Sequence, residues 1–307
     1  VHTGPHTVIG GTLALGDGFD TVIVDTTGTD LSGATLSDVE TLELATDVDA
    51  TLTLAQNALL GQAAGDNAVT LVDAGVATGA IHVERYQLAD GANDFTLGAV
   101  DQDVTGGSGD DLLRSGALGQ VSGALTGAAG DDTLLIEQDA TVDASLAGIE
   151  HLALATDVDI TTSLANHALL DGADGDNTVT LTESGVVTGA QAVEHYVLAD
   201  GANTFTLGDV GQDITGGSQD DVLHTGAAGT LTGSYALGAG DDRVVVDASG
   251  TSLAGASLSG VEAVDLAEDV AATLTVAQHA LLDAAVGDNT VTLADAGTFA
   301  GHADVEH

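Results

Sequence analysis

One block of about 110 residues is written almost three times along this chain, and this repeat limits the folds that the chain can adopt. The segment GGSGDDLLR begins at Gly106, and GGSQDDVLH begins 110 residues later at Gly216. Further landmarks recur at nearly the same interval, namely VERYQLADGANDFTLG from Val83 and VEHYVLADGANTFTLG from Val193, then ATDVDA from Ala45, ATDVDI from Ala155 and AEDVAA from Ala267. A fixed period of this kind predicts a repeat architecture, in which each unit packs against its neighbours.

The repeat divides the chain into three imperfect copies, residues 1–105, 106–215 and 216–307. The first copy lacks its start, the third lacks its end, and no change of composition separates them. We therefore expect one continuous body instead of separate domains. Because both ends fall inside a copy and no capping repeat is visible, we expect a piece of a longer repetitive polypeptide or a subunit that stacks end to end.

The apolar residues follow a pattern that predicts an all-β chain. Short alternating stretches each follow an acidic or amide residue: TVIV follows Asp20, TLEL follows Glu40, AVTL follows Asn67 and DFTL follows Asn93. Many such stretches start about 9 or 10 residues apart and others about 17 to 20, which are half-coil and whole-coil spacings. With Gly, Asp and Asn at the corners, this predicts a parallel β-solenoid or β-roll with two or three short strands per coil.

One segment in each copy departs from the strand pattern and favours a short helical turn. These segments are LAQNALLGQAA from Leu54, LANHALLDGAD from Leu164 and VAQHALLDAAV from Val276.

The charge balance excludes several classes of partner. The chain has 48 Asp and Glu but only 3 Lys and Arg, and a formal net charge of −45. Nucleic acid and anionic membranes would repel such a surface, and no apolar run is long enough to insert into a membrane. Self-repulsion opposes compaction, so we expect bound cations or high salt to stabilise the fold. The alternative is that the acids only keep the protein soluble.

The acidic glycine turns resemble a known calcium-binding motif. GGSGDDLLR, with Asp111 at its sixth position, fits the nonapeptide GGxGxDxUx of the RTX family, the secreted bacterial proteins that fold into calcium-loaded β-rolls. Degraded versions of the motif are GAAGDDTLL from Gly127 with Asp132, GGSQDDVLH with Asp221, LGAGDDRVV from Leu237 with Asp242, and LGDGFDTVI from Leu15 with Asp20.

The resemblance implies Ca²⁺ sites between stacked turns. Asp111 would pair with Asp132 and Asp221 with Asp242, each 21 residues apart, and Asp20 would belong to a further turn. Calcium takes six to eight oxygen ligands, which carboxylates and main-chain carbonyls would supply. The glycines implied in these turns are Gly107, Gly109, Gly130, Gly217 and Gly240. The alternative is that Asp-Gly corners are simply favourable turns, and we interpret the GDN and DGAN segments as structural corners in that sense.

No pattern of catalytic residues stands out, so we expect no enzymatic activity. The chain has no cysteine, and no nucleophile elbow, phosphate-binding loop or His-x-x-x-His pair is present. Its histidines change between copies: His167 and His279 correspond to Asn57, and His195 corresponds to Arg85. We interpret these histidines as solvated surface residues.

The expected function is structural. We expect an extracellular or cell-surface protein, secreted by a bacterium or archaeon, that is stiffened by calcium and self-associates into a surface layer, adhesin stalk or filament. A cell-surface polysaccharide is a further candidate partner, although only seven aromatic residues are present. The alternative is that these repeats are an RTX accessory region of a secreted enzyme or toxin.

Overall fold

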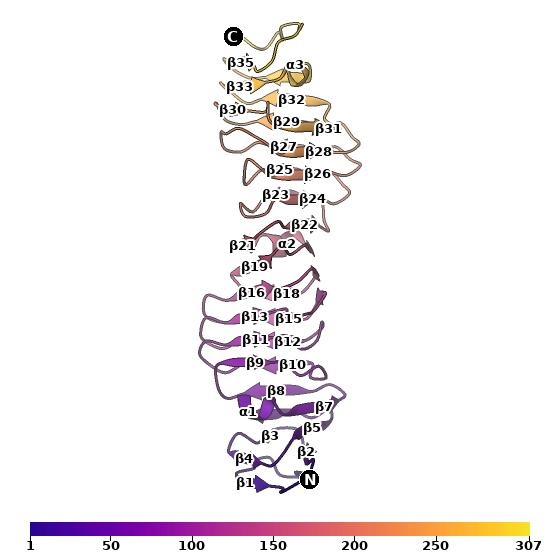
Figure 1. The fold of residues 1–307 in the computed structure, drawn as a ribbon, viewed down its shortest axis with the longest axis vertical. Coiled ribbons are helices and arrows are strands. Elements are labelled where there is room, and N and C mark those ends of the chain that lie inside the picture. The colour runs from indigo at the N-terminus through magenta and orange to yellow at the C-terminus, as the bar shows by residue number, and fades with distance from the viewer. The chain divides into compact units, whose positions relative to one another are not determined.

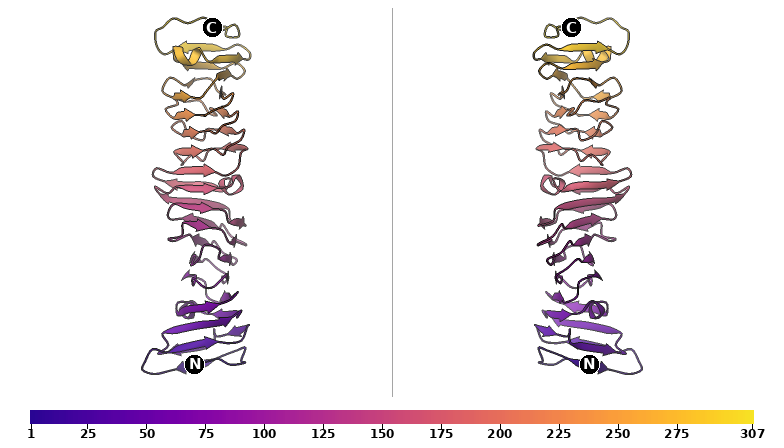
Figure 2. Two further views of the ribbon diagram at one scale, coloured as in Figure 1. Left: turned by 90° about the vertical axis from the view of Figure 1, so that its right-hand side faces the viewer. Right: turned by 90° about the vertical axis from the view of Figure 1, so that its left-hand side faces the viewer.

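The computed structural model describes all 307 residues and divides into two compact units, Val1–Ala155 and Thr156–His307. We call them unit 1 and unit 2. Each unit winds as a β-solenoid: successive strands lie on different faces, and strands about one coil apart pair in parallel (Figures 1 and 2). The prediction of an all-β parallel solenoid with short helical turns is therefore confirmed.

The faces of unit 1 are parallel sheets that run from coil to coil. One sheet contains β3 (Thr29–Asp30), β6 (Ala50–Leu52), β8 (Ala68–Leu71), β10 (Arg85–Gln87), β12 (Asp103–Thr105), β15 (Ala124–Thr126) and β18 (Ser145–Ala147). Another contains β9 (Val76–Thr78), β11 (Asp94–Thr96), β13 (Leu112–Arg114), β16 (Thr133–Ile136) and β19 (His151–Thr156). Shorter ladders join β2 (Thr21–Val24), β5 (Thr41–Thr46) and β7 (Leu60–Ala64), join β1 (Gly11–Ala14) to β4 (Ala34–Ser37), and join β14 (Gln120–Val121) to β17 (Ala140–Val142).

Unit 2 has the same organisation. One face contains β20 (Ile160–Thr162), β22 (Thr178–Leu181), β24 (His195–Val197), β26 (Asp213–Thr215), β28 (Ser234–Ala236) and β31 (Ser257–Ser259). A second contains β23 (Val186–Thr188), β25 (Thr204–Thr206), β27 (Val222–His224), β29 (Arg243–Val246), β32 (Ala263–Leu266) and β34 (Leu282–Ala285). A third contains β30 (Thr251–Ser252), β33 (Ala271–Leu274) and β35 (Thr290–Leu293), and β21 (Leu170–Asp174) precedes β22.

The core of each unit consists of columns of inward-facing side chains. In unit 1, Phe95, Leu113 and Leu134 pair in register on β11, β13 and β16 and are at most 1% exposed. In unit 2, Phe205 and Leu223 pair in the same way on β25 and β27. Parallel strands lie about 4.8 Å apart, so each side chain packs directly on its counterpart one coil away. Leucine and β-branched residues suit this arrangement, which explains the low aromatic content.

The three helices are single turns: α1 (Leu54–Asn57), α2 (Leu164–His167) and α3 (Val276–His279). Thr53 begins α1 with a capping box, in which its hydroxyl accepts from the Gln56 amide and the Gln56 side chain accepts from the Thr53 amide. The Gln56 Nε2 group also donates to the carbonyls of Leu31 and Ala34, at 2.7 and 3.0 Å, and so anchors the helix to the preceding coil. None of these helices has the length and apolar character of a membrane span.

Three buried tyrosines differ in whether their hydroxyl groups have partners. The Tyr86 hydroxyl accepts from the Ala80 amide at 2.8 Å and donates to Asn57 Oδ1 at 3.0 Å. The Tyr196 hydroxyl accepts from the Ala190 amide at 2.7 Å. The Tyr235 hydroxyl is fully buried without a hydrogen bond. Burial raises the pKa of all three hydroxyls, so they stay protonated.

Replacement of each tyrosine by phenylalanine should therefore have unequal effects. We expect Tyr86→Phe and Tyr196→Phe to lower the free energy of unfolding by about 1 to 2 kcal/mol, because each leaves a buried amide without an acceptor. Tyr235→Phe removes an unsatisfied hydroxyl and should leave stability unchanged or raise it by up to about 1 kcal/mol. Urea denaturation of the three variants measures this, and an equal loss in all three would contradict it.

Candidate metal sites at the acidic turns

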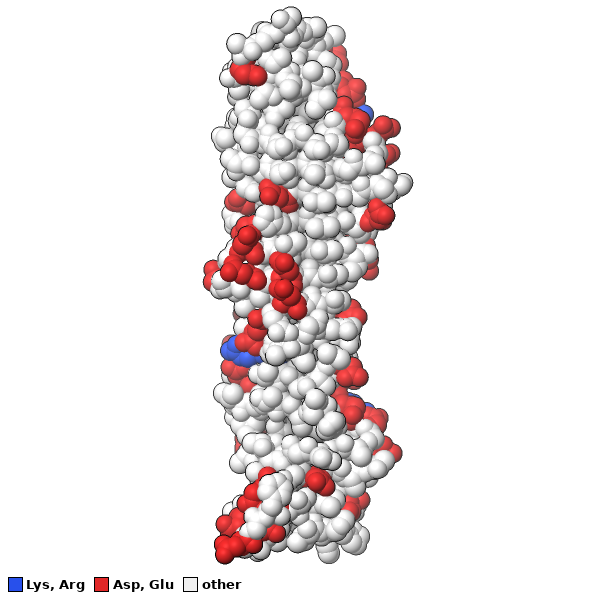
Figure 3. All heavy atoms as spheres, turned by 45° about the vertical axis from the view of Figure 1, so that its right-hand side comes forward, with Lys and Arg blue, Asp and Glu red and all other residues white.

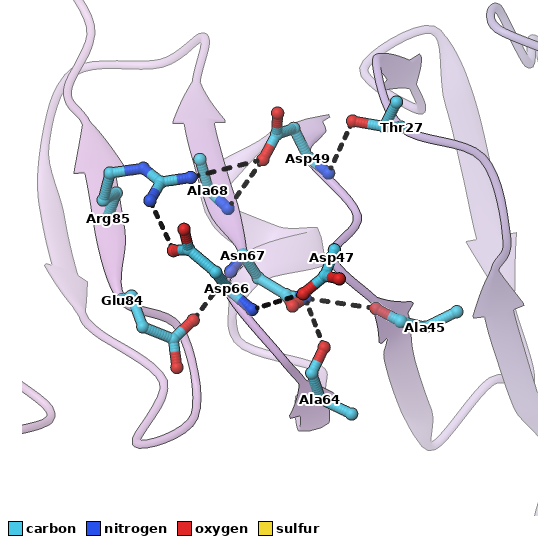
Figure 4. A network of polar contacts seen from close by, with 10 residues as sticks. All are labelled: Thr27, Ala45, Asp47, Asp49, Ala64, Asp66, Asn67, Ala68, Glu84 and Arg85. Atoms are coloured by element: carbon cyan, nitrogen blue, oxygen red, sulfur yellow. Dashed lines mark hydrogen bonds and ion pairs between the residues drawn. The ribbon is translucent and has the colours of Figure 1, made fainter.

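Acidic side chains of one coil accept hydrogen bonds from backbone amides of the neighbouring coil. Asp47 Oδ1 accepts from the Asp66 amide at 2.9 Å, and Asp49 Oδ1 accepts from the Ala68 amide at 3.0 Å (Figure 4). Asp47 has a positive φ of 59°, a conformation that aspartate tolerates better than most residues. The two aspartates of the repeated ATDVD segment thus bind backbone amides of the next coil.

A second type of contact runs in the opposite direction along the chain. Glu84 Oε2 accepts from the Asn67 amide at 2.7 Å, and the Asn67 side chain donates to the carbonyls of Ala45 and Ala64 (Figure 4). Arg85 forms ion pairs with Asp66 and Asp49 beside them. In unit 2 the corresponding acid-to-amide contacts join Asp157 to Asp176, Asp159 to Thr178 and Glu194 to Asn177. Many of the acids therefore hold coils together through charge-assisted hydrogen bonds.

The aspartates singled out by the RTX resemblance form a ladder of the same kind. In unit 1, Asp111 Oδ1 accepts from the Asn93 amide at 2.9 Å, and Asp132 Oδ1 accepts from the Asp111 amide at 2.7 Å. Glu150 Oε2 accepts from the Asp132 amide at 3.0 Å. In unit 2 the equivalent acceptors are Asp221, Asp242 and Glu262, with distances of 2.9, 2.7 and 2.9 Å. Each predicted pair thus lies on neighbouring coils, joined carboxylate to amide.

Asp111 and Asp221 have both carboxylate oxygens engaged. Their second oxygens, Oδ2, accept from the amides of Gly107 and Gly217 at 2.9 and 3.2 Å. Both aspartates are at most 2% exposed. A carboxylate that accepts from two or more backbone amides is well accommodated without a metal ion.

Asp132, Asp242 and Asp20 each retain one oxygen without a partner. The Oδ2 atom of each is buried and makes no hydrogen bond. The residues that correspond to Gly107 and Gly217 are Ala128 and Gly238, which have positive φ values of 81° and 102° and do not donate to these oxygens. Burial, reinforced by the neighbouring carboxylates, raises the pKa of Asp132 and of Asp242.

The glycines of these turns allow neighbouring coils to approach closely. A Cβ atom on Gly109 would lie 2.6 Å from the Gly91 carbonyl carbon, and one on Gly130 would lie 2.5 Å from the Gly109 oxygen. A Cβ atom on Gly240 would likewise lie 2.7 Å from the Gln219 carbonyl carbon. Of the ten residues predicted for metal binding, these three glycines therefore serve coil packing in the structure.

The residues present suit an oxygen-ligated cation at some of the turns. No group of three or more His, Asp or Glu side chains converges on one point, so an ion would take one carboxylate oxygen and complete its shell with main-chain carbonyls and water. Asp132 has such a carbonyl nearby. The position that a Cβ atom on Gly127 would occupy is 2.3 Å from Asp132 Oδ2 and 1.9 Å from the Gly148 carbonyl oxygen, so these two oxygens lie close together. The unpartnered oxygens favour Asp132, Asp242 and Asp20 over Asp111 and Asp221 as ligands.

The interpretation of His167 and His279 as solvated surface residues is wrong. They are only 4% and 8% exposed, because each is the last residue of a helix packed against the coil. Other histidines do lie at the surface, where they contact carboxylates: His195 lies 2.8 Å from Asp176 and His224 lies 2.8 Å from Asp247.

Comparison with known proteins assigns no family to the chain, since no family model, curated protein or solved structure matches it.

Proposed function

We propose that this chain is a non-enzymatic structural protein, a β-solenoid stabilised by Ca²⁺, that works outside the cell as part of a surface layer, adhesin stalk or filament. The observation that carries the proposal is the set of buried, unpartnered oxygens on Asp20, Asp132 and Asp242. All three lie in turns that resemble the RTX nonapeptide.

A bound cation would remove an energetic conflict at these oxygens. A buried carboxylate oxygen without a partner destabilises the charged form, which is why the pKa values of Asp132 and Asp242 are raised. The folded state then holds these protons more tightly than the unfolded chain. Without metal, stability should therefore fall as the pH rises from the ordinary aspartate range through the raised pKa values. Calcium would favour the ionised form and reverse this loss.

The distribution of polar contacts supports a structural role over a localised activity. The same acid-to-amide contacts occur in both units, at Asp111 and Asp132 and again at Asp221 and Asp242. The acids are thus used along the chain to join coils. On the face drawn in Figure 3, acidic patches are separated by wide areas without Asp, Glu, Lys or Arg. Since the strands pair in parallel from coil to coil, strands of another copy can add in the same way, and we propose self-association.

Thermal unfolding in millimolar calcium, in chelator and in millimolar magnesium tests the calcium sites. We expect the melting temperature to be highest in calcium, because a ligand present at about 100 times its Kd adds roughly 2.7 kcal/mol per site. Magnesium, which requires a more rigid octahedral shell, is the control and should stabilise less. Identical unfolding curves in calcium and chelator would contradict the proposal.

Light scattering over a range of protein concentrations tests the self-association. In millimolar calcium we expect the mean particle mass to rise with concentration, and chelator to reverse the rise. A strict monomer under both conditions would contradict the assembly but not the calcium sites, which the unfolding experiment measures independently.

A further inference from the structure

A groove of about 380 Å³ lies in unit 2 between α2 and β23. Its walls include Leu164 and His167 from α2, Leu170, and Val186 and Thr188 from β23. Val186 is 80% exposed, which is unusual for a strand residue of this size. The groove therefore has apolar side chains and two polar ones, His167 and Thr188, in its wall.

One edge of β23 faces this groove without a partner strand. β23 is the last strand of its sheet and pairs only with β25. Two hydrogen bonds show which backbone groups face β25. The Gly185 carbonyl accepts from the Thr204 amide, and the Gly189 amide donates to the Thr206 carbonyl. Because backbone groups alternate along a strand, those of Val186 and Thr188 point to the opposite side, toward α2.

His167 lines the groove, and its contact with Tyr196 determines its tautomer. The Tyr196 hydroxyl accepts from the Ala190 amide at 2.7 Å, and its only other polar contact is His167 Nε2, 3.0 Å away, so we assign its proton to a hydrogen bond with Nε2. Nε2 is then the acceptor, and the proton of the neutral imidazole lies on Nδ1. Burial lowers the pKa of His167, which keeps the ring neutral. The imidazole makes no other hydrogen bond, so the Nδ1 proton is available to a ligand.

The equivalent groove of unit 1 provides a natural comparison. It has a volume of about 410 Å³ and lies between α1 and β9, with Leu54, Asn57 and Val76 in its walls. Here Asn57 replaces the histidine: its Oδ1 accepts from Tyr86, and its Nδ2 donates to the Thr78 carbonyl at 3.0 Å. Asn57 thus covers the strand carbonyl itself. In unit 2 no side chain covers the corresponding Thr188 carbonyl.

We propose that the unit 2 groove binds an extended peptide segment of a partner protein, which adds as a strand to the free edge of β23 and accepts a hydrogen bond from His167 Nδ1. The backbone groups of Val186 and Thr188 recognise the main chain. Leu164, Leu170 and Val186 contact alternate aliphatic side chains. Basic residues flank the bound segment, because the chain carries a net charge of −45 and Glu183 contacts the Leu164 amide at the groove. This binding activity goes beyond the proposed structural function and does not depend on calcium.

Fluorescence anisotropy with a labelled, end-blocked peptide of alternating valine and threonine flanked by lysines tests the proposal. We expect saturable binding to the wild-type chain. His167→Asn should weaken it about tenfold to a hundredfold, because it removes the Nδ1 donor and, as Asn57 does in unit 1, places an amide on the strand carbonyl. Since asparagine occupies the same position in unit 1, this variant should fold, which circular dichroism verifies. Asn57→His should add a second site of similar affinity in unit 1.

Two altered peptides separate strand addition from other modes of binding. A peptide with N-methyl groups on the backbone amides that would face β23 should lose binding, whereas N-methylation on the opposite edge should not. Replacing the lysines by glutamates should also weaken binding. The proposal is wrong if no saturable binding occurs, or if His167→Asn and Asn57→His both bind the peptide like the wild type. It is also wrong if the two N-methylated peptides bind equally, because the groove would then bind side chains without strand addition.

Discussion

Gly98→Ala and Gly208→Ala should each lower the free energy of unfolding by about 3 kcal/mol, because the new methyl group has no room. A Cβ atom on Gly98 would lie 2.0 Å from the Gly79 carbonyl oxygen of the preceding coil, and one on Gly208 would lie 2.0 Å from that of Gly189. Both obstacles are backbone atoms, so no side-chain rotation can relieve the contact. The coils must separate locally, and parallel strand pairing on both sides of the substitution should weaken.

Gly119→Ala is the matched control for steric crowding. A Cβ atom there would lie 3.9 Å from the nearest atom, the Asp139 oxygen, and the residue does not have a positive φ. We expect no loss, or a gain of up to about 1 kcal/mol from the lower entropy of the unfolded chain. Urea denaturation followed by circular dichroism gives the differences, and hydrogen exchange locates them. Equal stability of Gly98→Ala and Gly119→Ala would show that the coils are not packed this closely.

Most of the fold could be predicted because its determinants are local and repeated. Alternating apolar residues, acidic or glycine corners and the period of about 110 residues all indicate stacked short strands. The helical turn at Leu54 could be recognised in the same way, since Thr53 and Gln56 form a capping box within four residues. The division into units at Ala155 has no such local signal.

The site could be predicted only in part, because it depends on how coils align. The sequence shows that Asp111 and Asp132 are 21 residues apart, but not that one carboxylate meets the amide of the other. Whether a carboxylate has a free oxygen depends on the φ of one turn residue, such as Ala128. The burial of His167 could not be predicted, because its change to asparagine in another copy resembles surface variation. In the structure this change alters a buried hydrogen-bonding group.

Asparagine substitutions at Asp111 and Asp132, on neighbouring coils, should differ in their dependence on calcium: the effect of the first should be the same with and without calcium, and that of the second should depend on it. Asp111 uses both carboxylate oxygens as acceptors, so Asp111→Asn places an NH₂ group against an amide donor, at Asn93 or at Gly107. We expect a loss of about 1 to 3 kcal/mol with or without calcium. Asp132→Asn keeps an acceptor for the Asp111 amide and places its NH₂ group where Oδ2 has no partner. In chelator it should therefore be neutral or stabilising, since it removes a buried charge.

In calcium the stability difference between the two variants should narrow or reverse. Asp132→Asn loses a proposed ligand, so its gain in melting temperature on adding calcium should shrink, and the double variant Asp132→Asn, Asp242→Asn should lose most of it. Asp111→Asn should have a lower melting temperature in chelator than the wild type, but its melting temperature should rise by the same amount on adding calcium. Thermal unfolding of the variants in calcium and in chelator measures both effects. If all of them gain as much from calcium as the wild type, the ion binds elsewhere and the unpartnered oxygens of Asp132 and Asp242 are not its ligands.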